Sequence, residues 1–521
     1  MLRDVWLAAA LVCGVVVLSA PGAAGRTASS PTPVWGAPVF AGTLSDGHDN
    51  ELQTVDLNGD GLVDVVVADE IYDRIQATPP VLLLNRGGGR FVDATASLFD
   101  GSPPKAEWDR QMVFADFNGD HRPDIFIADI GTDNTAINPG YPGEQNELIL
   151  SEPNGKFRDA TANLPQRFTF THSAAAADVN GDGSIDIFEN SLGHADILLN
   201  DGSGHFTVAN DRLRGFPLDA YGHTHSYACA FADVNGDGHP DLILGGDDAV
   251  ERSAVLLNDG HGFFDFFEWL PPKLYGTNAL VLSIASTDVN GDGAVDLLLE
   301  ESRQDPYYIG SKVQVLINDG HGHFSDETST RFPDEPNAQS WPERLMLEDL
   351  NDDGKADVFL QYAPPGIVPE ADPAPVWLNQ NGVFVPIKPP VQGLPPGSRG
   401  MVGFVNGDGP HAFFSLASIR DNSPAAYYVR PEIVAPTTAP TSLQAQTTPH
   451  GVRIFWRPVA GASKYEVWQA QPKLLLGSTS TTSYLDTRAR HPQHTRYQVR
   501  ARNAAGAGPF STEVTAPKTG R

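Results

Sequence analysis

The chain has 521 residues, and its 65 Asp and Glu residues outnumber its 35 Lys and Arg residues, so that the formal net charge is −30 at pH 7. This acidic balance argues against nucleic acid or anionic lipid as a partner. With only two cysteines in the whole sequence, a small fold held together by disulfide bonds is excluded.

Residues 1–25 are typical of a secretory signal peptide. Arg3 gives a short basic start, LAAALVCGVVVLSA an apolar core, and PGAAG a region of small residues for cleavage. An uncleaved anchor is the alternative, but the apolar run is short for a membrane span and no stop-transfer flank follows it. We therefore expect a secreted or cell-surface protein with no membrane insertion after cleavage. The lack of any N-x-[ST] sequence, together with many Ala, Pro and Gly residues, favours a bacterial source.

From residue 56 the chain repeats an acidic loop of the form D-x-N-x-D-x-x-x-D, each copy just ahead of an apolar run. The copies begin at Asp56, Asp116, Asp178, Asp233, Asp288 and Asp349, and a degenerate seventh, FVNGDGPHA, begins at Phe404. The starts are 55 to 62 residues apart. A repeat of this length is one small supersecondary unit copied around a ring or along a stack.

Oxygen-bearing side chains at positions one, three, five and nine of the loop predict a calcium site. Calcium takes roughly 6–8 oxygen ligands, whereas magnesium demands a strict octahedron and an EF-hand needs a Glu at position 12. In the first copy the ligands would be Asp56, Asn58, Asp60 and Asp64, with the carbonyl of Leu62 at position seven. The other five copies supply Asp116, Asn118, Asp120, Arg122, Asp124, Asp178, Asn180, Asp182, Ser184, Asp186, Asp233, Asn235, Asp237, His239, Asp241, Asp288, Asn290, Asp292, Ala294, Asp296, Asp349, Asn351, Asp353, Lys355 and Asp357, with the seventh-position residue again using its carbonyl.

The alternative interpretation is a set of Asx-turns that hold no metal. Against it, each of the six copies keeps the ninth-position Asp, and three clustered Asp residues without a cation would repel one another. We therefore expect about six calcium ions. In the seventh copy Phe404 and Ala412 replace the first and last ligands, so only Asn406 and Asp408 remain and we expect an empty loop.

A second signature follows each loop: an apolar run, a turn such as Asn-Asp-Gly, and another apolar run, as in VLLNDGHGFF from Val255. This pattern predicts a hairpin, so each repeat offers about four strands. Seven such units over residues 33–432 predict a seven-bladed β-propeller. An open solenoid is the alternative. PVWGAPVF near the N-terminus and AAYYVRPEI after the last repeat are expected to pair and complete the last blade.

These loops and hairpins resemble the FG-GAP/VCBS repeat family, which shares its calcium loops with the integrin alpha-chain propeller. The resemblance implies the propeller fold and the metal. It implies little about activity, because the family includes adhesion modules, lectins, polysaccharide lyases and many bacterial surface proteins, and a shared fold does not transfer a reaction.

A Pro/Thr linker at 433–441 leads to a segment, 442–521, that resembles a fibronectin type III domain. The residues that carry this resemblance are Trp456, Tyr465, Tyr497, Val499, Ala501, Asn503, Gly506 and Gly508. The predicted fold class is therefore all-β, with a seven-bladed propeller followed by a fibronectin type III sandwich.

Candidate catalytic residues lie five to eight positions ahead of the loops, just before the predicted inner strands: Arg110, His172, His225 and Arg344, with Asp49, Asn50, Asp109, His223, Glu343, Arg399, Trp108 and Trp341 nearby. In a lyase an Arg would neutralise a uronate carboxylate and a His or Arg would take the proton. The alternative interpretation is that these are ordinary polar residues at the blade entrances.

We expect a binding or adhesion module for an extracellular glycan or protein. The alternative is a carbohydrate-active enzyme, above all a polysaccharide lyase with its site at the channel mouth. A lectin with one pocket per blade gap is disfavoured, because the segments between strands vary in length and content. The oligomeric state is left open.

Overall fold

The computed structural model describes residues 34–35, 39–43, 50–69, 77–87, 91–131, 142–192, 194–209, 211–217, 224–306, 310–332, 342–349, 354–362, 376–387, 398–405, 412–417, 425–429, 431–432, 438–448, 450–457, 459, 462, 464–488, 495–503 and 506–515. The predicted signal peptide, most of the linker and the centre of the seventh loop lie outside the described residues. The chain divides into two compact units, one containing the repeats and one containing the C-terminal residues from Pro431 onward.

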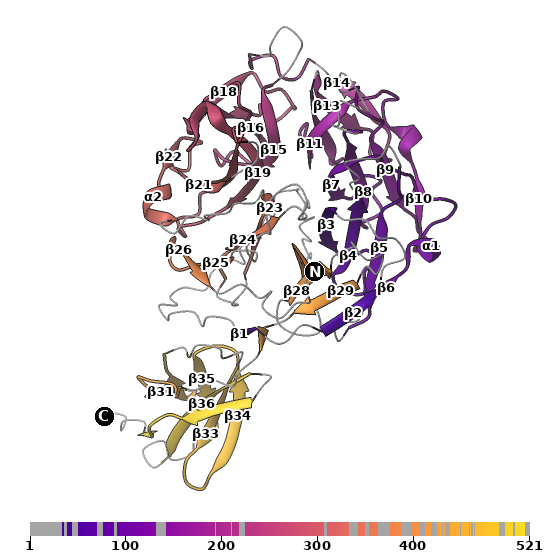
Figure 1. Ribbon diagram of the computed structural model, residues 1–521. Coiled ribbons are helices and arrows are strands. Elements are labelled where there is room, and N and C mark those ends of the chain that lie inside the picture. Colours follow the sequence, from indigo (N-terminus) through magenta and orange to yellow (C-terminus); the bar gives the residue numbers. More distant parts are fainter. Residues whose placement is uncertain are drawn as a thin grey trace. The chain divides into compact units, whose positions relative to one another are not determined.

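The described residues of the repeat unit form seven four-stranded antiparallel sheets and four very short helices (Figure 1). In chain order they are β3 (Asn50–Val55), β4 (Asp64–Asp69), β5 (Val81–Asn85), β6 (Phe91–Asp93); β7 (Asp109–Ala115), β8 (Asp124–Asp129), β9 (Glu147–Ser151), β10 (Phe157–Asp159); β11 (Phe170–Ala177), β12 (Asp186–Leu192), β13 (His194–Asn200), β14 (Phe206–Ala209); β15 (Ser226–Ala232), β16 (Asp241–Gly246), β17 (Arg252–Leu257), β18 (Phe266–Pro272); β19 (Ala279–Thr287), β20 (Asp296–Arg303), β21 (Ser311–Asn318), β22 (Phe324–Asp326); β23 (Pro342–Glu348), β24 (Asp357–Tyr362), β25 (Val376–Asn379), β26 (Phe384–Ile387); and β27 (Ser398–Val405), β28 (Ala412–Ala417), β29 (Ala425–Val429), β2 (Val39–Thr43). The helices are α1 (Thr95–Leu98), η1 (Thr161–Asn163), η2 (Gly276–Asn278) and α2 (Thr328–Arg331).

The last of these sheets contains strands from both ends of the repeat region. Strand β2 pairs antiparallel with β29, with Val39 opposite Tyr428, and Figure 1 shows the indigo β2 beside the orange β29. A second short pair joins β1 (Val34–Trp35) to β30 (Pro431–Glu432). The pairing predicted between the two ends is therefore confirmed.

The apolar core of the repeat unit lies between neighbouring sheets. One cluster joins Phe126 of β8 to Ala174 of β11, and the next joins Phe188 of β12 to Phe231 of β15. A single four-stranded sheet cannot bury its own faces, so each sheet needs the next one. Strand β11, with the sequence FTHSAAAA, is buried along its whole length, which explains the small side chains in the first strand of the repeat.

The C-terminal unit is a β-sandwich, as predicted. One sheet holds β31 (Gln444–Thr448), β32 (Gly451–Phe455) and β35 (Ser483–Asp486), and the other holds β34 (Leu474–Thr479), β33 (Lys464–Gln469), β36 (Arg496–Asn503), β37 (Gly506–Phe510) and β38 (Val514–Thr515). Trp456, Tyr465 and Tyr497 pack in the shared core. Across the described residues, the structure contains no helix that is long and apolar enough to cross a membrane.

Candidate functional site

Each acidic loop connects the first strand of its sheet to the second. The ninth-position Asp is the first residue of the second strand, as Asp64 is in β4 and Asp186 in β12. Five loops are described completely, whereas Asn351 and Asp353 of the sixth lie outside the described residues. The predicted ligands of the five complete loops are thus held at equivalent places in successive sheets.

The third loop shows how the first three ligand positions are held. Asp178 accepts hydrogen bonds from the backbone N–H groups of Gly181 at 2.8 Å and Gly183 at 2.9 Å. Asn180 accepts one from the N–H of Asp182 at 2.9 Å, and Asp182 in turn accepts one from Ser184 at 2.8 Å. Gly181 and Gly183 have φ of 75° and 90°, which glycine adopts without strain. The loops therefore do contain Asx-turns, and these turns orient the carboxylates.

The ninth-position Asp is fully buried and joins three parts of the repeat. Asp186 accepts hydrogen bonds from the N–H of Val179 at 3.2 Å and from the N–H of Asn200 at 2.8 Å. Burial, helped by the charges of neighbouring loop carboxylates, raises the pKa of this Asp to about 7 in the first three loops and to about 6 in the fourth and fifth. A cation at the loop would stabilise the ionised form.

The donor chemistry of the loops fits calcium. Among the described residues, no three His, Cys, Asp or Glu side chains are already gathered as a metal-holding group. Each complete loop nevertheless offers three carboxylates, one amide oxygen and one backbone carbonyl, all of them oxygen donors. This set suits a hard cation and lacks the nitrogen and sulfur ligands that zinc or copper would select.

In four of the described repeats, an Asn at the end of the third strand ties the loop to the preceding repeat. Asn258 donates from Nδ2 to the carbonyl of Val179 at 2.9 Å and to the carbonyl of Pro240 at 3.0 Å. Its Oδ1 accepts the N–H groups of Gly260 and Gly262. The same contact between repeats joins Asn200 to Phe117, Asn318 to Val234 and Asn379 to Val289.

We call this contact the Asn latch, and sequence reasoning missed it because the Asn was interpreted only as a turn residue. The second repeat departs from the pattern, since Ser151 stands where the others have Asn. In this repeat the side chain of Arg122 makes the contact between repeats instead: its Nη2 donates to the carbonyl of Leu57 in the first repeat at 3.4 Å. The signal available in the sequence was the recurrence of Asn at this position, as Asn85, Asn200, Asn258, Asn318 and Asn379.

The candidate catalytic residues occupy the strand ends opposite the loops. They were expected just before the inner strands, but Arg110, His172 and Arg344 lie within β7, β11 and β23, and only His225 precedes its strand. Outside the described residues lie Asp49, His223 and Trp341, together with the side chains of Asn50, Glu343 and Arg399.

His172 is buried rather than open at a channel mouth, with 8% of its surface exposed. Its Nδ1 lies 3.2 Å from the carbonyl oxygen of Tyr227, and the two rings are 3.8 Å apart. Burial, and then the charge of Arg110, lower the pKa of His172 well below its usual value. Strands β7 and β11, which carry Arg110 and His172, contact each other, whereas His225 pairs with Asp247 at 3.2 Å.

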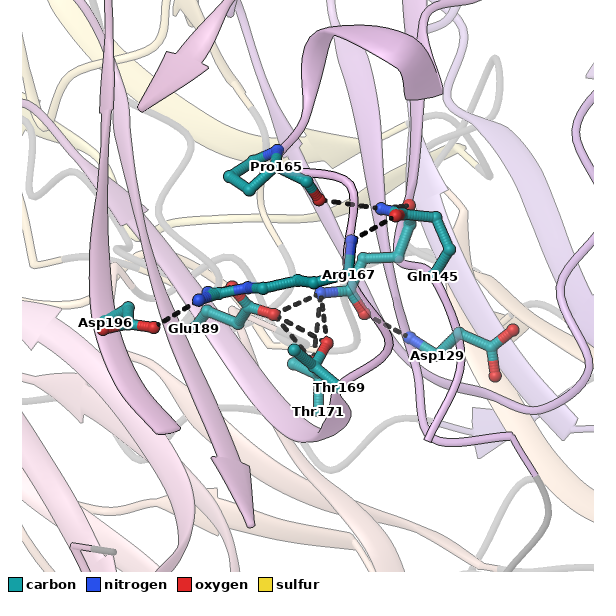
Figure 2. A network of polar contacts seen from close by, with 9 residues as sticks. Asp129, Gln145, Pro165, Arg167, Thr169, Thr171, Glu189 and Asp196 are labelled. Atoms are coloured by element: carbon teal, nitrogen blue, oxygen red, sulfur yellow. Dashed lines mark hydrogen bonds and ion pairs between the residues drawn. The ribbon is translucent and has the colours of Figure 1, made fainter. Parts of the chain in front are cut away.

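The same strand ends hold buried carboxylates that the sequence did not reveal. Figure 2 shows Arg167 between Glu189 and Asp196, at 2.6 and 2.7 Å. The other oxygen of Glu189 accepts hydrogen bonds from Asn146, Thr169 and Thr171. With every partner supplied by the protein, this network is structural.

One outer strand carries an exposed aromatic surface. In β18, Phe266 is 75% exposed and Trp269 is 44% exposed. Trp269 contacts Phe267 and Phe216, with ring centroids 5.3 and 5.9 Å apart. We call Phe216, Phe266, Phe267 and Trp269 the β18 aromatic patch. The rings of Phe216, Phe267 and Trp269 pack against one another, and Phe266 and Trp269 are exposed to solvent.

A protein-family profile described as FG-GAP-like repeat matches residues 56–127 and 233–299. The chain therefore contains FG-GAP-like repeats, which confirms the resemblance of its loops. Among curated proteins no sequence matches significantly.

Similar solved structures include a rhamnogalacturonan lyase of Bacillus licheniformis, 14% identical over 76% of this chain and 75% of that chain, with a TM-score of 0.37. An exo-type rhamnogalacturonan lyase is 12% identical over 93% of this chain and 75% of its own, with a TM-score of 0.34. The C-terminal part is similar to the structure of FN3tt, 21% identical over 16% of this chain and 98% of that chain, with a TM-score of 0.15.

Proposed function

We propose that this chain, with its FG-GAP-like repeats, is an exported calcium-binding β-propeller that binds an extracellular glycan or protein. The first strands of successive sheets contact one another from β3 through β7, β11, β15 and β19 to β23. Strand β27 contacts both β24 and β3. Together with the pairing of β2 and β29, these contacts support a closed ring of seven blades.

Calcium would be held by the loop residues predicted from the sequence. When bound, it supplies positive charge to a cluster of three carboxylates in each loop. The chain's own contribution is to orient those carboxylates through backbone N–H bonds and to fix the loop to the preceding blade through the Asn latch. Six such ions, each with a charge of +2, would change the formal charge from −30 to −18.

The observation that carries the binding proposal is the β18 aromatic patch. Trp269 keeps nearly half of its surface exposed while Phe216 and Phe267 support it from the side. Exposed aromatic clusters mark interaction sites, and Trp is enriched among residues that dominate binding energy. The neighbouring Glu268, paired with His323 at 2.9 Å, adds hydrogen-bonding groups that a sugar or a protein could use.

The test is a binding screen of the purified full chain, in calcium, against neutral and acidic polysaccharides. Trp269→Ala should weaken a detected interaction by about tenfold or more. Phe168→Ala removes another exposed aromatic ring, 66% exposed, and should leave binding unchanged. Equal losses in both variants would contradict a site at β18, and no binding to any polysaccharide would direct the search to protein ligands.

A polysaccharide lyase is the second candidate, and the contact between β7, which carries Arg110, and β11, which carries His172, favours it. A neutral His172 could accept a proton, and Arg110 could neutralise the carboxylate of a uronate. In that case incubation with acidic polysaccharides would generate the ultraviolet absorbance of an unsaturated uronate. The absorbance would disappear in His172→Gln and persist in Trp269→Ala.

A further inference from the structure

The charge of the chain is divided very unequally. Residues 442–521 contain eleven Lys and Arg against three Asp and Glu, a net charge of +8, whereas residues 1–441 contain 24 against 62, a net charge of −38. The acidic character therefore belongs entirely to the part with the repeats. A sign change of this size between parts of one chain indicates different partners for the two parts.

Five of the eleven basic residues of the C-terminal unit lie on or beside the solvent face of one sheet. In β33 and β36, Tyr465, Val467, Val499 and Ala501 point into the core, so the alternating residues point outward. Lys464 lies opposite Arg502, and Glu466 lies opposite Arg500. We call Lys464, Lys473, Arg496, Arg500 and Arg502 the cationic face.

Two aromatic rings, those of Trp468 and Phe510, contact two of these cations. The guanidinium of Arg500 lies 5.3 Å from the ring centroid of Trp468 and 4.9 Å from that of Phe510. The Nζ of Lys473 lies 4.3 Å from the Phe510 ring. The rings thus act as supports, and cations that are already ordered lose less entropy when they bind a ligand.

The face also shows how it holds a carboxylate. Two nitrogens of Arg500, Nε and Nη2, lie 2.7 Å from Oε2 of Glu466, and Arg502 lies 3.2 Å from Oε1. Glu466 therefore pairs with both arginines, and its side chain is 10% exposed. Arg502 and Arg496 keep 40% and 55% of their side chains exposed, although Arg496 pairs with Glu513 at 3.1 Å. Lys464 and Lys473 are exposed as well.

We propose that the cationic face is a docking surface for an extracellular acidic polysaccharide of the polyuronate type. A linear chain with one carboxylate per sugar complements a row of spaced cations, and guanidinium groups match planar carboxylates. Single-stranded nucleic acid fits less well, because it needs free aromatic faces on which bases stack, and here Arg500 and Lys473 cover the rings. This site is separate from the β18 aromatic patch and does not depend on it.

The probe for the test is a set of short oligogalacturonates, too short to gel with calcium, titrated into the full chain at low salt. The variant Lys464→Gln/Lys473→Gln removes two charges from the face and leaves the Glu466 pairs intact. The control Arg453→Gln/Arg457→Gln removes two exposed charges associated with the other sheet. The face variant should bind at least about fivefold more weakly, with a shallower salt dependence, while the control stays within about twofold.

Equal losses in the two variants would overturn the proposal, because net charge rather than this face would govern binding. Tighter binding of single-stranded DNA than of oligogalacturonate would overturn the choice of polymer. A loss confined to Trp269→Ala would place the sugar on the repeats instead, which would refute the cationic face and support the proposed function. Failure of oligogalacturonate to bind the unchanged chain would refute the face and leave the propeller proposal standing.

Discussion

The side-chain amide of Asn258 donates a hydrogen bond of 2.9 Å to the backbone carbonyl of Val179, a residue 79 positions earlier in the preceding repeat. Val179 is the second residue of an acidic loop, and its own N–H donates to the buried Asp186 of that loop. The Asn latch therefore connects the hairpin turn of one repeat to the candidate metal loop of its neighbour.

Replacing Asn258 with Ala should destabilise the repeat unit by about 3 kcal/mol, because two carbonyls and two N–H groups lose their partner in a buried site. The melting temperature of the repeat unit measures this loss. The exposed Asn154→Ala is the control and should shift stability by less than about 0.5 kcal/mol. A small effect of Asn258→Ala would show that water replaces the latch.

Removing calcium should lower the melting temperature of the repeat unit, and adding calcium, but not magnesium, should restore it. A site with a Kd of about 0.1 mM in about 2 mM calcium contributes roughly 2 kcal/mol. Asp182→Ala should lower the number of bound calcium ions by one, as measured by elemental analysis. Asp201→Asn, an exposed Asp on the following turn, should leave that number unchanged. A melting temperature unaffected by chelator would refute the calcium assignment.

Replacing Glu147 with Gln should stabilise the repeat unit at about pH 7.5 and change little at about pH 5. Glu147 is buried, and within the described residues its Oε2 accepts no hydrogen bond. Burial, and then the charges of Asp129 and Asp109, raise its pKa well above the usual value. The folded chain therefore retains a proton that the unfolded chain has lost, so stability falls as pH rises from the unfolded pKa, about 4.3, toward the folded one.

Gln imitates the protonated carboxyl and avoids that loss, which melting curves at the two pH values will show. The exposed Asp211→Asn changes the net charge equally and should shift stability the same small amount at both pH values. A Glu147→Gln chain that is less stable at the higher pH would mean that the carboxylate has a favourable partner.

Replacing Arg167 with Met should destabilise the repeat unit by about 3–5 kcal/mol, because Glu189 and Asp196 would remain as buried charges without a cation. Adding Glu189→Gln and Asp196→Asn should recover part of the loss. The half-exposed pair of Arg158 with Glu152 supplies the comparison, and Arg158→Met should cost less than about 1 kcal/mol. If the triple variant is no more stable than Arg167→Met, packing rather than charge explains the loss.

Local features were predictable from the sequence. The Asx-turns of the third loop, such as the bond from the Asp182 N–H to Asn180, span two to five residues, and the hairpin turns span a similar distance. Such contacts involve only residues that are close together in the chain, so the same residue types recur wherever the turn recurs. The pairing of β2 with β29 was also predictable, because a last repeat that lacks one strand needs a partner from elsewhere in the chain.

The surroundings of individual side chains were not predictable. His172 was expected near an open mouth, yet Tyr227, 55 residues later in the next sheet, covers it. Arg122 was a candidate only through its carbonyl, yet its side chain replaces a missing Asn latch. These outcomes depend on which side chains of adjacent sheets contact each other. The spacing of residues within one repeat does not predict those contacts.

The repeat length, the oxygen-rich loops, the four-strand units and the C-terminal sandwich could all be predicted from the amino-acid sequence, because each follows from short-range hydrogen bonding and alternation of apolar residues. Which carboxylates are buried, which are paired, and which basic residues share one face became known from the folded structure. Burial and charge pairing depend on contacts between residues far apart in the chain, as Asn258 and Val179 are, and these exist only after the sheets have packed.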